Sequence, residues 1–80
     1  MIRYGKKTKL DPEQVLDKAD RFFGPAGLGL ETEDKGPACG RWTGGGGFVS
    51  ISTCQDAEGT EVDLQSREWE TQAREFVARL

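Results

Sequence analysis

The chain of 80 residues has no histidine, and this absence bears directly on catalysis. Histidine is the usual general base near pH 7 and the usual activator of a serine or cysteine nucleophile. Without it, acid–base chemistry would fall to carboxylates. The candidates lie on strand positions expected to face water, where their catalytic value is low: Glu31, Glu33, Glu61 and Asp63. We therefore expect no enzyme and no catalytic residues.

Cysteine is also scarce, with only Cys39 and Cys54 in the chain. A structural zinc site needs four cysteine or histidine ligands, so one copy of this chain cannot complete such a site. The two thiols could instead form a redox switch or share a site between two copies, but small strand residues are the simpler interpretation. We expect no metal and no cofactor.

The glycine run Gly44–Gly47 offers bare backbone N–H groups of the kind that cradle phosphate. A nucleotide-binding loop also needs a lysine followed by serine or threonine, and a helix whose N-terminus meets the phosphate. The strand-like segment 48–51 follows here instead. The run therefore predicts the loop of a β-hairpin, with a ligand cradle as the alternative.

Long apolar runs are absent, and none approaches the roughly 18 residues of a membrane span. Lysine and aspartate interrupt the first fifteen residues, so no signal peptide is expected. These features predict a cytoplasmic protein, a compartment in which the two cysteines remain thiols.

Charge is unevenly distributed along a chain whose net charge is −3. Its first ten residues carry four cations and no acid: Arg3, Lys6, Lys7 and Lys9. Residues 1–9 are predicted to be either a basic flexible arm or an edge strand. An arm could bind nucleic acid through phosphates, but the acidic remainder would repel it, which makes nucleic acid an unlikely partner.

Two amphipathic helices are predicted. The first begins at Asp11 as N-cap, with Pro12 at N1 and Gln14 completing a capping box, and it ends at Gly24 in a left-handed conformation. The second is expected to begin at Ser66 as N-cap. Apolar residues recur at helical spacing in both: Val15, Leu16, Ala19, Phe22 and Phe23, then Trp69, Ala73, Phe76, Val77 and Leu80. Trp69 is expected to anchor its helix on the sheet, or else to serve as a binding hot spot.

Alternating segments predict strands at residues 28–33, 38–43, 48–54 and 60–64, and residues 1–4 form a further edge strand or a frayed end. The fold class is therefore α+β, in the order (β)-α-β-β-β-β-α. We expect an antiparallel sheet of four strands, or five with the N-terminal one, and both helices on one face. Residues 1–80 form a single domain with a thin core.

The central hairpin can be assigned a register. If the four glycines form its loop, Thr43 faces Phe48, and one sheet face carries the apolar residues Trp42, Val49 and Ile51. The other face is mostly polar. It is the predicted ligand or partner site, formed by Cys39, Arg41, Phe48, Ser50, Ser52 and Cys54. Arg41 could clamp a carboxylate or phosphate there.

Three segments carry a family resemblance: residues 46–51, 60–64 and 67–70, the last reading Arg-Glu-Trp-Glu. They resemble small uncharacterised prokaryotic α+β proteins. The strands leading into a C-terminal helix are also similar, over about the last fifty residues, to START-like helix-grip proteins. That likeness implies binding of an apolar ligand, but a chain of this length cannot enclose such a cavity, and no site residue carries over.

These observations favour a small non-catalytic cytoplasmic domain that acts through protein–protein contacts, with a homodimer through a sheet face or edge as one form. The alternative is small-ligand binding, either on the polar face around Arg41 or in a groove between helix and sheet. Nucleic-acid binding through residues 3–9 is the third hypothesis. The protein is not expected to interact with a membrane.

Overall fold

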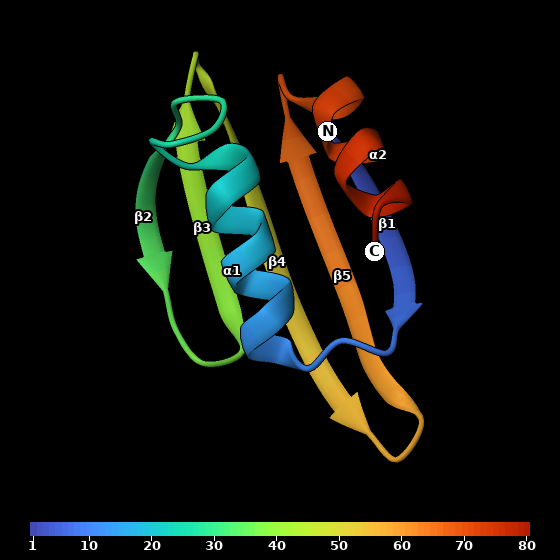
Figure 1. The fold of residues 1–80 in the computed structure, drawn as a ribbon. Helices are drawn as coiled ribbons and strands as arrows, with labels where there is room; N and C mark the ends of the chain where they lie inside the picture. The colour runs from blue at the N-terminus through green and yellow to red at the C-terminus, as the bar shows by residue number, and fades with distance from the viewer.

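The computed structural model describes residues 1–80 as a sheet of five strands with two helices (Figure 1). The order β-α-β-β-β-β-α confirms the predicted fold class. The N-terminal segment contributes the fifth strand. The elements are β1 Ile2–Thr8, α1 Pro12–Phe23, β2 Glu31–Lys35, β3 Cys39–Gly44, β4 Gly47–Asp56, β5 Gly59–Arg67 and α2 Glu70–Ala78.

All neighbouring strands are antiparallel, in the spatial order β1-β5-β4-β3-β2. Strand β4 is therefore central, and β1 and β2 form the two edges. Helix α1 packs over β3 and β4, and α2 packs over β1 and β5, on the same face of the sheet (Figure 1). Neither helix is long and apolar enough to cross a membrane.

The start of α1 follows the predicted capping chemistry. The Asp11 side chain accepts a hydrogen bond from the Gln14 backbone N–H at 2.8 Å, and the Gln14 side chain accepts one from the Asp11 N–H at 3.0 Å. The helix ends at Gly24 as predicted, but the left-handed conformation was wrong, since Gly24 is extended with φ −72°. Glycine is needed there for space, because a Cβ atom would lie 2.4 Å from the Asp20 carbonyl oxygen.

The predicted register of the central hairpin is confirmed, with Thr43 opposite Phe48 and Trp42 opposite Val49. The ladder continues one pair further, to Gly44 opposite Gly47, and leaves a two-residue turn. Gly45 and Gly46 have φ values of 58° and 81°, as a type I′ turn requires.

The predicted start of the first internal strand at Leu28 was wrong, because β2 begins only at Glu31. The backbone N–H groups of Leu28 and Leu30 donate to the carbonyl oxygens of Phe22 and Phe23, at 3.0 and 2.9 Å. These bonds close the turn after α1, so residues 28–30 cannot pair with β3. The alternation of Leu28 and Leu30 therefore predicted a strand that begins three residues too early.

The predicted N-cap at Ser66 was also wrong. Ser66 lies within β5, opposite both Ile2 and Val49, and it is fully buried. The chain turns away from the sheet at Glu68, whose φ is 71°, and α2 begins at Glu70 without a side-chain cap. Pairing with two neighbouring strands stabilises Ser66 in β5 more than a single capping hydrogen bond would stabilise it at the start of α2. This explains why β5 extends to Arg67.

Helices and sheet enclose one apolar core of twelve buried residues. Trp69 packs against its edge, and its indole Nε1–H donates to the Gly44 carbonyl oxygen at 2.9 Å, which fits the predicted anchoring role. The core residues are Val15, Leu16, Ala19, Phe23, Leu30, Trp42, Val49, Ile51, Val62, Leu64, Ala73 and Phe76.

Candidate functional site

The face of the sheet opposite the helices is covered by no element of the chain (Figure 1). We call it the open face. Residues opposite each other in antiparallel strands share a face, so the register assigns its members in rows across the strands. From β1 to β3 the rows are Arg3, Gln65, Ser50 and Arg41; Gly5, Asp63, Ser52 and Cys39; and Lys7, Glu61 and Cys54. A further row joins Arg67, Phe48, Thr43 and Glu31.

All six residues of the predicted site are members of the open face. Arg41 lies opposite Ser50, and Cys39 lies opposite Ser52. Cys54 pairs with Glu61 on β5, so the two cysteines are diagonal neighbours and not a facing pair. Both are exposed free cysteines.

Arg41 has two partners within the chain. Its guanidinium carbon lies 4.3 Å from the centre of the Phe48 ring, and its Nε lies 3.1 Å from Oε1 of Glu33. Glu33 sits at the irregularity between Thr32 and Asp34, where β2 shifts its register against β3. An exposed pair of this kind contributes at most about 1 kcal/mol to stability. The guanidinium thus lies over the Phe48 ring and shares its charge with the Glu33 carboxylate.

Strand β1 is bound to the sheet by ion pairs as well as by its backbone. The Arg3 guanidinium donates two hydrogen bonds to the Asp63 carboxylate, at 2.9 and 2.5 Å. This contact lowers the pKa of Asp63 and raises that of Arg3. Two of the four N-terminal cations are thus engaged by acids of the sheet, because Lys7 pairs with Asp56 in the same way.

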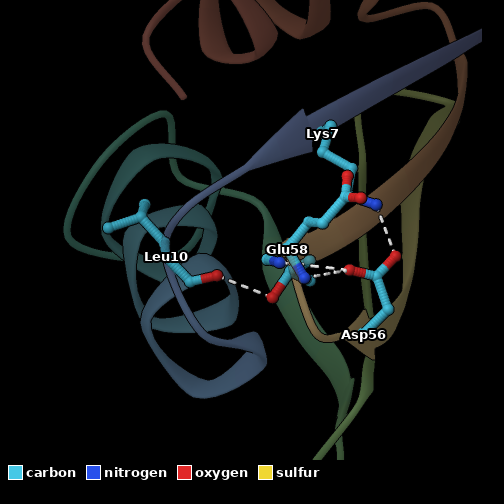
Figure 2. A network of polar contacts seen from close by, with 6 residues as sticks. Lys7, Leu10, Asp56 and Glu58 are labelled. Carbon is cyan, nitrogen blue, oxygen red and sulfur yellow. Dashed lines mark hydrogen bonds and ion pairs between the residues drawn. The ribbon is translucent and has the colours of Figure 1, made fainter.

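Asp56 organises the turn between β4 and β5 (Figure 2). Its Oδ1 accepts the backbone N–H groups of Glu58 and Gly59 at 2.8 and 3.1 Å, and its Oδ2 pairs with the Lys7 ammonium group. The ammonium group is the main cause of its lowered pKa, followed by the Glu58 N–H. Strand β4 thus runs to Asp56, beyond its predicted end at residue 54, because the aspartate supplies the hydrogen bonds that a tight turn needs.

The two edge strands of the open face carry opposite charge, with charges of both signs on the strands between them. The edge strand β1 presents the cations Arg3 and Lys7 on this face. The opposite edge strand β2 presents Glu31 and Asp34, together with the Glu33 carboxylate that reaches Arg41. Sequence reasoning missed this difference between the edges. The composition of residues 2–8 and 31–35 already shows their opposite charges, but only the strand order places these two segments at opposite edges of the sheet.

Sequence reasoning also missed the polar group beneath the sheet. Asp20 of α1, which lies beside the apolar stripe, accepts hydrogen bonds from the Thr32 hydroxyl at 2.7 Å and the Trp42 indole at 2.9 Å. The indole is the larger cause of its lowered pKa and the hydroxyl the next. The carboxylate, the hydroxyl and the indole N–H thus satisfy one another's hydrogen-bonding needs. The cluster of Asp20, Thr32 and Trp42 attaches α1 to β2 and β3.

No protein-family model, curated protein or solved structure matches the chain.

Proposed function

We propose that the chain is a non-catalytic domain that acts through protein–protein contacts, and that its open face pairs with the open face of a second copy. The observation that carries the proposal is the opposite charge of the two edge strands of this uncovered face. A cationic margin at β1 and an anionic margin at β2 make the face complementary to itself. An anionic margin also opposes binding of nucleic acid along the sheet.

Pairing through an edge is less favourable than pairing through the face. Strand β1 carries Arg3, Lys6 and Lys7 without an acid, and β2 carries three acids and one lysine. A two-fold axis would place each edge against its own copy, with like charges opposite one another. Joining β1 to the β2 edge of another copy removes the repulsion but forms an open chain of molecules, not a closed dimer.

Face-to-face packing avoids this conflict when the two-fold axis runs parallel to the strands. Such an axis lies along the central strand β4 and reverses the strand order in the second sheet. Strand β1 of each copy then lies over β2 of the other, so that Arg3 approaches Asp34, which lies in the same row, with Glu31 in the next row. Phe48 and Ser50 of the two copies meet near the axis. Aligned sheets pack about 10 Å apart in this way.

The size of the face suits a modest interface. The two longer extents of the molecule, measured between Cα atoms, are 37 and 21 Å, so a face of this span is of the same order as the roughly 800 Å² that each partner buries in a standard interface. Much of the surface is already ion-paired. We therefore expect a dimer that dissociates in the micromolar range and not an obligate one.

The setting we propose is the cytoplasm of a prokaryotic cell. The free cysteines support a reducing compartment, and the sequence likeness to small prokaryotic proteins supports the source.

Sedimentation velocity over a micromolar concentration series tests the dimer. Ser50→Glu adds a carboxylate at the centre of the open face, beside the proposed axis, and should leave a monomer of 8.8 kDa. Thr71→Glu adds the same charge on an exposed position of α2 and should dimerise like the unaltered chain. A monomer at all concentrations would contradict self-association and leave a different protein or a small ligand as the occupant. Dimerisation unaffected by Ser50→Glu would contradict the proposal that the open face forms the interface.

A further inference from the structure

The helical side of the molecule contains a groove between α1 and α2 with a volume of about 320 Å³. Two aromatic rings form its apolar floor: Phe22 and Phe76, with centroids 5.6 Å apart. Phe76 is buried, whereas Phe22 is half-buried and so presents part of its ring to the groove. Every other lining residue is a cation: Lys18, Arg21 and Arg79.

The cations come from both helices and line the same groove. Lys18 and Arg21 lie one helical turn apart on α1, and Phe22 follows directly. Arg79 lies at the end of α2, with its guanidinium carbon 5.3 Å from the Phe22 centroid. Its Nη2 lies 2.5 Å from Oε1 of Glu75, so its charge is shared with that carboxylate. The groove thus joins a planar apolar surface to a cluster of positive charge.

Lys18 and Arg21 make no ion pair and no side-chain hydrogen bond, although acids outnumber bases in this chain by 14 to 11. A cation near a helix C-terminus also favours the helix dipole, which accounts for the positions of Arg21 and Arg79 in the chain. It does not account for Lys18 in the middle of α1. A second hollow of about 260 Å³ shares Lys18 and Arg21 and extends the groove along α1 to Leu10 and Gln14.

We propose that this groove binds a small organic anion that carries an aromatic or other flat apolar group. The apolar part lies on Phe22 and the exposed edge of Phe76, and the carboxylate, sulfonate or phosphate takes the free donors of Lys18 and Arg21. The cavity volume is at the small end of the range for ligand pockets, which limits the occupant to a compact molecule. Because the groove and the open face lie on opposite sides of the sheet, binding here is independent of dimerisation.

The probe pair consists of 8-anilinonaphthalene-1-sulfonate and N-phenyl-1-naphthylamine, which share their aromatic rings and differ in the sulfonate. Fluorescence titration should show saturable binding of the sulfonate to the unaltered chain and weaker binding of the neutral compound. The double variant Lys18→Gln with Arg21→Gln should weaken sulfonate binding roughly tenfold and leave the neutral compound unchanged. Arg67→Gln removes one charge from the open face and should change neither.

Amide chemical shifts of the labelled protein locate the bound probe. We expect the largest changes around Arg21, Phe22 and Arg79. Failure of the chain to bind the sulfonate, equal affinity in the double variant, or shifts centred on the open face would each overturn the proposal. The Ser50→Glu variant separates the two proposals, because it should be monomeric and still bind the sulfonate with unchanged affinity.

Discussion

The indole Nε1–H of Trp42 donates a hydrogen bond of 2.9 Å to Oδ1 of Asp20, and thereby joins the largest core side chain to a carboxylate of helix α1. The Thr32 hydroxyl donates to the same oxygen at 2.7 Å. One carboxylate thus satisfies polar groups on two strands. Its removal would leave a buried indole N–H without a partner, which is costlier than the loss of an exposed hydrogen bond.

Replacing Asp20 by alanine should therefore lower the free energy of unfolding by about 2–3 kcal/mol. Asp17 provides the matched control, since it lies on the same helix and pairs with Lys35 at the surface at 2.8 Å. Asp17→Ala should cost less than about 1 kcal/mol. Urea unfolding at pH 7 measures both. Equal losses in the two variants would show that the Asp20 cluster contributes no more than a surface ion pair.

The same carboxylate predicts a dependence of stability on pH. Folding lowers the pKa of Asp20, so its contribution is complete above the pKa of the unfolded chain, about 3.9, and is lost as pH falls through the lower pKa of the folded state. Asp20→Asn cannot titrate. The stability difference between the unaltered chain and this variant should shrink as pH falls below about 4. A constant difference from pH 6 to pH 2 would contradict the assignment.

Ser66 offers a stabilising substitution. Its hydroxyl is buried between Ile2 and Val49 and has no hydrogen-bond partner, so Ser66→Ala should raise the free energy of unfolding by about 1 kcal/mol. Ser52→Ala, at an exposed position of the open face, should change stability by less than about 0.5 kcal/mol. Thermal and urea unfolding measure both. A loss of stability in Ser66→Ala would mean that the hydroxyl is satisfied in solution.

Two strand glycines should respond oppositely to the addition of one methyl group. At Gly40 a Cβ atom would lie 2.5 Å from Cη2 of Trp42, and the buried ring cannot move aside. Gly40→Ala should cost about 1–3 kcal/mol through overpacking. At Gly5 the nearest atom to a Cβ is the Val62 carbonyl oxygen at 4.0 Å, so Gly5→Ala should be neutral or stabilising. The same unfolding measurements apply, and similar effects at both sites would contradict the packing around Trp42.

Local patterns predicted the fold well because they reported on local chemistry. The capping box at Asp11 and the alternation around Trp42 and Val49 each involve residues a few positions apart, and both were confirmed. Ser66 was misassigned and Asp20 was missed for the opposite reason. Each side chain takes its role from strands distant in sequence, and a polar residue beside an apolar stripe looks solvated until those strands are in place.

The open face and the cationic groove also differ in how far the sequence alone predicted them. Members of the open face followed from the hairpin register, since period-two alternation assigns every second residue to one side. The opposite charges of the two edge strands needed the order of all five strands. The cationic groove needed the approach of two helices, because Lys18 and Arg21 on α1 show no relation to Arg79 on α2 in the sequence.

Chemical cross-linking at the cysteines tests the face-to-face dimer most directly. Cys54 lies on the central strand β4, so the proposed axis places it opposite the Cys54 of the second copy. Cys39, on β3, lies one strand spacing of about 4.8 Å from the axis, and its two copies lie on opposite sides of it. A short bismaleimide should therefore give a covalent dimer with the unaltered chain and with Cys39→Ser, but not with Cys54→Ser. No covalent dimer at concentrations at which the protein sediments as a dimer, or one that requires Cys39, would contradict the account.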